Sequence, residues 1–234
     1  MDFENELIPG VLIKRYKRFF VDIKLKNKTV TAHCPNPGSM IKLLDKGNPV
    51  WITKSKNKER KLKYTLQIIE VDNVKICVNT HITNKIVQES INKGLIKELK
   101  SFQIIRPEKK FGKDTRFDFF LYNNKTDKKA FLEVKSVSLQ RKTKHAEFPD
   151  SVTSRGKKHL ENLISAYEQG YESYLMFLIQ MEKCKSFSIA SDIDPKYYAV
   201  FNNALKKNVN VLCYDCKFSN KGIEINKKID LLNE

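Results

Sequence analysis

The sequence has no run of about 18 apolar residues, so no helix is expected to span a membrane. It does not open like a signal peptide either, because residues 1–6 are acidic and polar. Its five cysteines are odd in number and scattered, which is typical of reduced thiols and not of a disulfide framework. Together these absences predict a cytoplasmic protein without a membrane partner.

Acidic residues are also scarce. The 234 residues include 27 Asp and Glu but 44 Lys and Arg, which leaves a formal net charge of +17. Such an excess lies at the surface, where it attracts polyanions. The expected partner is therefore DNA, or RNA. Since 41% of the residues are hydrophobic, we expect a folded chain with a real core. No coiled-coil pattern is present, so the oligomeric state stays open.

Residues 1–82 are predicted to form a small barrel. Over residues 18–26 the apolar side chains alternate with charged ones, which indicates a half-buried strand with Phe19 on its apolar face. Further strands are expected over residues 29–32, 50–53, 62–71 and 74–79, with a loop at Pro35–Gly38. Several short strands without a convincing helix favour an OB-like barrel.

Residues 83–234 are predicted to form a second domain of helices and strands. An apolar stripe at helical spacing follows the candidate N-cap Asn84 and runs to Leu99. The expected elements that follow are strands over 102–105, 117–122 and 130–137, a helix over 156–169, a buried strand over 174–179, a helix over 195–207 and a strand over 209–213. This order predicts a mixed α/β (α+β) protein whose second sheet is flanked by helices.

Two carboxylates on neighbouring strands are the candidate catalytic centre. Asp118 lies on one strand, and Glu133 and Lys135 share a face of the next. If the two strands form a hairpin, the acids meet and need a cation, for which oxygen ligands favour Mg²⁺ or Mn²⁺. Lys135 then assists an attacking water or stabilises charge on phosphorus. The alternative is a pair of exposed acids with Lys135 as an ordinary salt-bridge partner. The surrounding order of elements matches the PD-(D/E)XK nuclease core.

Basic residues gather in three places. Arg155, Lys158 and His159 stand at a helix N-terminus, as in a phosphate clamp, although a solvated helix start explains them too. Two other segments interleave cations with rings, an arrangement suited to phosphates and bases. Their candidate nucleic-acid-binding residues are Arg15, Tyr16, Lys17, Arg18, Lys54, Arg60, Lys61 and Tyr64. Cys213 and Cys216 form a lone C-x-x-C pair, which is weak as a zinc signal.

Several long stretches resemble the sugar fermentation stimulation protein (SfsA) family. They are residues 12–19, 32–40, 111–112, 115–119, 132–137, 148–150 and 153–160. The resemblance implies an OB-like first domain, a PD-(D/E)XK-type second domain and DNA binding with little sequence preference. It carries the nuclease motif onto Asp118, Glu133 and Lys135, and it adds Glu89 as a further metal ligand. Phe117 occupies the position of the proline in the PD-(D/E)XK motif.

Two functions follow as expectations. The first is a DNA-binding protein with a Mg²⁺- or Mn²⁺-dependent phosphodiesterase site. The second is a non-catalytic DNA-binding regulator of sugar metabolism that retains the nuclease fold. A flat response of binding to salt would favour a third reading, an enzyme acting on a small anionic metabolite.

Overall fold

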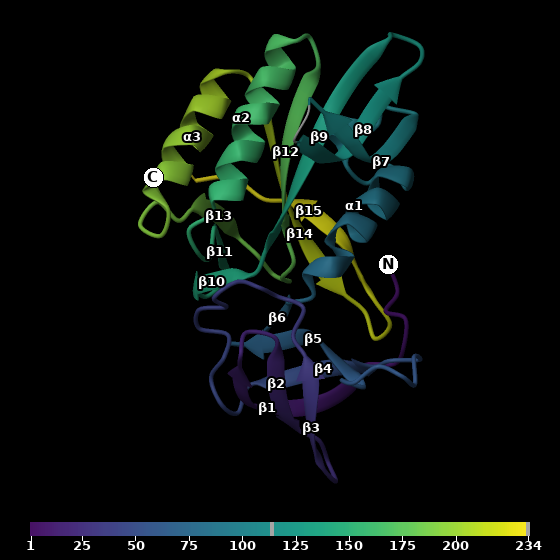
Figure 1. Ribbon diagram of the computed structural model, residues 1–234, viewed down its shortest axis with the longest axis vertical. Coiled ribbons are helices and arrows are strands. Elements are labelled where there is room, and N and C mark those ends of the chain that lie inside the picture. The colour runs from purple at the N-terminus through teal and green to yellow at the C-terminus, as the bar shows by residue number, and fades with distance from the viewer. Residues whose placement is uncertain (113–114, 233–234) are drawn as a thin grey trace.

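The first domain is a closed barrel. A computed structural model describes residues 1–112 and 115–232, and Figure 1 shows the barrel below the larger second domain. The barrel strands are β1 (Ile8–Tyr16), β2 (Phe20–Lys24), β3 (Thr29–His33), β4 (Pro49–Lys54), β5 (Tyr64–Val71) and β6 (Val74–Cys77). They run in the order β3-β2-β1-β4-β5-β6, and pairing of β3 with β5 closes the first five into a cylinder.

The barrel core follows the predicted alternation, except at Phe19. Val21 and Ile23 of β2 are fully buried, as the alternation requires. Phe19 is 41% exposed, so its assignment to the apolar face is wrong. The reason is local: Lys17 and Arg18 have positive φ and form a tight turn, which ends before β2 begins at Phe20. Strand β1 was missed, because its sequence lacks a clear alternating pattern.

The second domain contains a six-stranded mixed sheet. Its helices are α1 (Thr83–Asn92), α2 (Ser154–Glu168) and α3 (Pro195–Lys206). The sheet has the order β15-β14-β12-β9-β8-β7, with the strands β7 (Ile104–Phe111), β8 (Thr115–Asn123), β9 (Lys128–Val137), β12 (Glu172–Ile179), β14 (Asn210–Phe218) and β15 (Ile223–Lys228). A second sheet has the order β10-β11-β13, with β10 (Leu139–Lys142), β11 (His145–Phe148) and β13 (Ser186–Ile189). Helices α2 and α3 lie together on one side of the large sheet in Figure 1, and α1 lies on the other.

Most of the predicted elements of this domain are present. Strand β12 is central and almost wholly buried, as expected of an apolar run. Helix α1 is shorter than predicted: it ends at Asn92, Gly94 has a φ of 65°, and Leu95 is 41% exposed. The sequence analysis missed the strands β10, β11, β13 and β15. The last two residues of the expected second domain, 233–234, lie outside the described part of the chain.

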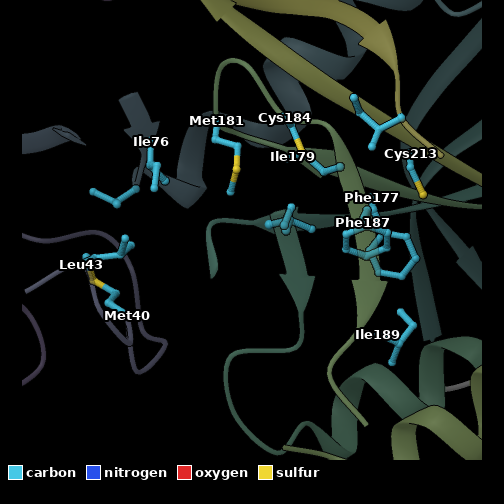
Figure 2. Close-up of a cluster of buried hydrophobic side chains, with 14 of the residues drawn as sticks. Met40, Leu43, Ile76, Phe177, Ile179, Met181, Cys184, Phe187, Ile189 and Cys213 are labelled. Carbon is cyan, nitrogen blue, oxygen red and sulfur yellow. The ribbon is translucent and has the colours of Figure 1, made fainter. Parts of the chain in front are cut away.

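The two domains share one core. Figure 2 shows Met40, Leu43 and Ile76 of the barrel facing Ile179 and Met181 of the second domain. Backbone pairing reinforces the junction: Ile76 forms a bridge with Met181, and the amide of Cys77 donates to the carbonyl of Gln180 at 2.7 Å. Met181 is fully buried. The barrel is therefore held in a fixed position relative to the large sheet.

Of the helices in the described residues, none combines the length and apolar character that crossing a membrane would need.

Candidate active site

The candidate site lies where the backbone pairing between β8 and β9 ends. Their ladder ends at the pair Phe119 and Leu132, so Asp118 and Glu133 are the next residues along the two strands. Phe117 packs in the cluster that includes Leu160 of α2, whereas Phe119 packs in the cluster that includes Ile86 of α1. Residues two apart normally share a face of a strand, so β8 twists at Asp118. The two acids therefore lie just beyond the last paired residues of the hairpin, at the point where β8 changes the face it presents.

Asp118 is held by neutral donors. Asn84 of α1 donates from its side-chain amide to one carboxylate oxygen at 2.7 Å, and the backbone amide of Val134 donates to the other at 2.8 Å. Within the described residues Asp118 forms no ion pair. Burial, followed by the negative charge of Glu133, raises the pKa of Asp118. The two carboxylates follow the last paired residues of neighbouring strands, which is consistent with this effect of one charge on the other.

Glu133 lies at the centre of a polar cluster on the α2 side of β9. The ammonium of Lys135 donates to its Oε1 at 2.8 Å, and the Nδ1 of His159 donates to the same oxygen. Arg155 donates to the Nε2 of His159 at 3.4 Å, which is consistent with the ring proton being on Nδ1. Glu133 is 3% exposed, and in the described part of the chain its Oε2 has no hydrogen-bond partner.

The pKa of Glu133 lies below its usual value even though the group is buried. Burial alone would raise it, but the hydrogen bond from His159 and the positive charge of Lys135 outweigh that effect. Glu133 is thus an anion at neutral pH, with one oxygen neutralised and the other unpaired. An unpaired buried carboxylate oxygen is costly unless a cation or a donor reaches it.

Glu89 is not part of this cluster. Its carboxylate pairs with Lys93 at 2.7 Å and with the N-terminal amine at 3.1 Å, beside β15. On the face of α1 that approaches Asp118, the side chain present is Asn84. No group of three or more His, Cys, Asp or Glu side chains within residues 1–112 and 115–232 is arranged to hold a metal. Cys213 and Cys216 pack in different core clusters, so they do not face each other across a common site.

A groove of about 440 Å³ runs between the barrel and the start of α1. We call it the barrel groove. Lys54, Arg60 and Lys85 supply cations to its walls, and the N-terminal segment with Asp2 and Glu4 lines another part. Lys85 directly follows Asn84, which donates to Asp118, so α1 contributes one residue to the groove and the next to the candidate site.

Three aromatic rings in or beside the barrel groove, those of Phe19, His33 and His81, were not among the candidate residues predicted from the sequence. Phe19 stacks on His33 with ring centroids 6.2 Å apart, and His33 lies 6.2 Å from His81. Burial, and then the charges of Arg60 and His81, lower the pKa of His33, so its ring is neutral at neutral pH. These residues are distant in sequence. The one available signal was that Phe19 directly follows the basic residues Lys17 and Arg18, whereas only barrel closure brings His33 and His81 to it.

The other predicted barrel residues have different surroundings. Lys17, Arg18, Lys54 and Lys61 are exposed, as a phosphate contact requires. Tyr16 stacks on Phe20 at 5.6 Å, and Tyr64 lies under the ammonium of Lys28 at 5.7 Å. In the third basic segment Lys158 is exposed, whereas His159 is turned inward to Glu133.

Arg15 holds the barrel loop at residues 36–39. Its guanidinium donates to the carbonyl oxygens of Arg18 at 2.7 Å, Asn36 at 2.8 Å and Gly38 at 3.0 Å. We expect Arg15→Ala to lower the free energy of unfolding by about 2–3 kcal/mol, because it removes several charge-assisted hydrogen bonds. Urea denaturation measures this loss. Arg15→Lys should recover little of it, since an ammonium cannot reach all these carbonyls. Equal stability of Arg15→Ala and wild type would contradict the structural role.

A closed barrel joined to a mixed sheet with helices on both faces defines a two-domain α/β protein. Residues 13–78 match the family model described as the SfsA N-terminal OB domain, and residues 81–222 match the one described as the sugar fermentation stimulation protein RE domain. The chain belongs to the sugar fermentation stimulation protein (SfsA) family.

Similar proteins match along the whole chain. A sugar fermentation stimulation protein homolog of Pelagibacter ubique is 52% identical over 233 residues, covering 100% of both chains. A homolog of Pseudoalteromonas atlantica is 42% identical and covers 99% of this chain and 100% of its own. A solved structure of Pyrococcus furiosus SfsA in complex with Ca²⁺ has a TM-score of 0.87 at 23% identity, covering 100% of this chain and 98% of that one.

Proposed function

We propose that this protein binds DNA and carries a divalent-metal phosphodiesterase site at Asp118, Glu133 and Lys135. The single observation that carries the proposal is the buried, unpaired Oε2 of Glu133 beside a second carboxylate that has no cationic partner within the described residues. A hard dication can bind oxygen atoms of both carboxylates at once and also compensates their two negative charges, which a neutral water cannot do.

The donor set fits Mg²⁺ or Mn²⁺. Asp118 and Glu133 would hold the ion through oxygen atoms, with the remaining positions left to water and to phosphate. When bound, such an ion polarises a phosphoryl oxygen and makes a bound water more acidic. The Pyrococcus furiosus relative was solved in complex with Ca²⁺, which is likewise a hard cation that takes oxygen ligands.

The chain's own residues have separate roles around this site. Asn84 and the amide of Val134 orient the carboxylate of Asp118, and His159 orients that of Glu133. Lys135 is 2.8 Å from Glu133, so its ammonium can stabilise negative charge that develops on a nearby phosphate. Arg155 is exposed and adjoins His159, which suits it to hold a neighbouring phosphate.

The barrel groove supports the DNA-binding part of the proposal. It combines cations for phosphates with a short stack of rings on which bases can lie. We expect Lys54→Ala/Arg60→Ala to reduce the slope of log K against log[salt] by about 1.4 on single-stranded DNA, from the loss of two phosphate contacts. Fluorescence anisotropy in EDTA measures the slope. Lys196→Ala/Lys206→Ala, on α3, removes the same charge and should leave the slope unchanged.

The alternative function is DNA binding without cleavage. The observation that favours it is the ion pair of Glu133 with Lys135 and its hydrogen bond with His159, together with the pairing of Glu89 elsewhere, which leaves two carboxylates at the site. Incubation of plasmid and single-stranded DNA with the protein in Mg²⁺ or Mn²⁺ separates the two functions. Cleavage that EDTA abolishes supports the phosphodiesterase, and salt-sensitive binding without cleavage supports the regulator.

A further inference from the structure

A pocket at the edge of the large sheet combines exposed cations with an aromatic floor. This edge pocket has a volume of about 550 Å³ and is bordered by Arg106, Lys109 and Lys110 of β7 and Lys129 of β9. Phe120 and Phe131 line it, with ring centroids 5.4 Å apart, and the ring of Tyr171 lies 4.9 Å from that of Phe131. Strand β7 is the last strand of its sheet, so this border faces solvent.

Among the described residues, most of the charge of the edge pocket is not compensated by acids. No Asp or Glu lines it in the described part of the chain, and Arg106, Lys109 and Lys110 form no ion pair there. Lys129 alone approaches an acid, Asp127, at 3.5 Å. The pocket beside β15 shows the contrast: its Lys93 and Lys217 are paired with Glu89 at 2.7 Å and Glu224 at 3.1 Å. Four gathered cations, of which three have no carboxylate partner among the described residues, favour a polyanionic partner.

The rings define which polyanion fits best. The ammonium of Lys109 lies over the Phe120 ring at 5.9 Å, so a cation and an aromatic face are presented together. Phe120 is partly buried and Phe131 is 3% exposed, so the rings form a recessed floor. A flat base can enter such a hollow and stack, while its phosphates contact the lysines. Insertion into a membrane surface instead requires apolar groups that project outward.

We infer that the edge pocket is a second contact surface for single-stranded nucleic acid, with a base on Phe120 and phosphates on Arg106 and Lys110. This inference rests on the proposed nucleic-acid binding and extends it beyond the barrel groove. Phe131 precedes Glu133 by two residues on β9, which is about 7 Å along the strand. A strand bound in the edge pocket therefore lies within a few nucleotides of the proposed catalytic carboxylates.

The test uses the full chain and a 20-nucleotide single strand that contains 2-aminopurine, in EDTA so that no cleavage occurs. We expect Arg106→Gln/Lys110→Gln to lower the salt slope by about 1.4, from the loss of two phosphate contacts. We expect Phe120→Leu to weaken binding by about 10-fold and to reduce the quenching of 2-aminopurine, because a base loses its stacking surface. Lys196→Gln/Lys206→Gln is the charge-matched control and should behave as wild type.

Two results would overturn the inference. One is that both edge-pocket variants bind the oligonucleotide with the same affinity, the same salt slope and the same quenching of 2-aminopurine as the control. The other is unchanged oligonucleotide binding accompanied by lost binding to phosphatidylglycerol vesicles or to an acidic peptide. If the proposed nucleic-acid binding itself were wrong, wild type would not bind the oligonucleotide. That result is distinct from the two results above, in which wild type binds. The double variant alters exposed side chains and so tests the surface even if Phe120→Leu disturbs folding.

Discussion

Glu133→Gln is expected to slow Mg²⁺- or Mn²⁺-dependent cleavage of DNA by about 1,000-fold. The substitution keeps the shape of a side chain that is 3% exposed, but it removes the negative charge that the metal requires. It also replaces the charged acceptor of Lys135 and His159 by a neutral amide oxygen, which accepts weaker hydrogen bonds. The initial rate of plasmid cleavage measures the effect, and DNA affinity in EDTA should change by less than about 3-fold, since the buried carboxylate makes no contact with the barrel groove.

Glu161→Gln is the matched control for this prediction. Glu161 is an exposed acid on α2, two residues beyond His159, and it lies outside the cluster around Glu133. Its replacement should leave the cleavage rate within about 2-fold of wild type. If Glu133→Gln cleaves as fast as Glu161→Gln, the proposed site is not the catalytic centre. If no protein in the series cleaves but all bind, the non-catalytic function is the correct one.

Met181→Ala is expected to lower the free energy of unfolding by about 2–5 kcal/mol. Met181 is fully buried at the junction where its backbone pairs with Ile76, and Figure 2 shows it facing the barrel residues. Removing its side chain leaves a cavity between the two domains. Urea denaturation should show a lower midpoint, and barrel and sheet should still unfold in one transition, because the backbone pairing of Cys77 with Gln180 persists.

Met181→Leu separates cavity formation from any special property of methionine. Leucine fills nearly the same volume, so we expect a loss below about 1.5 kcal/mol. Equal and large losses in both variants would show that packing volume at the junction is not the cause. Two resolved transitions in wild type would show that the shared core does not couple the domains.

The sequence alone was sufficient for features that depend on local pattern. Alternation along residues 18–26 predicted the strand found at Phe20–Lys24, and the apolar run over residues 174–179 predicted a buried strand, because side-chain direction in a strand has a period of two. The same period of two placed Glu133 and Lys135 on one face of their strand, and their catalytic role with Asp118 stays a prediction. The OB-like barrel and the sheet with helices were predicted from the order of elements, and the matches to the SfsA family agree with both.

Predictions from the sequence were wrong where the hydrophobic pattern continues past a residue at which the backbone turns. Phe19 fits the alternation, but the turn at Lys17 and Arg18 places it outside β2 and on the surface. The apolar stripe after Asn84 continues to Leu99, but α1 ends at Asn92, ahead of Gly94 with its positive φ. The role of Arg15 as a DNA contact stays a prediction, and what the basic segment did not indicate is that its guanidinium also donates to carbonyl oxygens of a loop that is distant in sequence.

The sequence by itself determined the basic surface, the strands that carry the two acids and the family to which the chain belongs. Tertiary structure decided which side chains meet: Asn84 with Asp118, His159 with Glu133, Phe19 with His33, and the edge pocket's cations over its rings. The physical reason is the separation along the chain of the residues that each feature involves. Charge and side-chain alternation are local properties of the chain, whereas these contacts arise only when barrel closure and sheet pairing bring distant segments together.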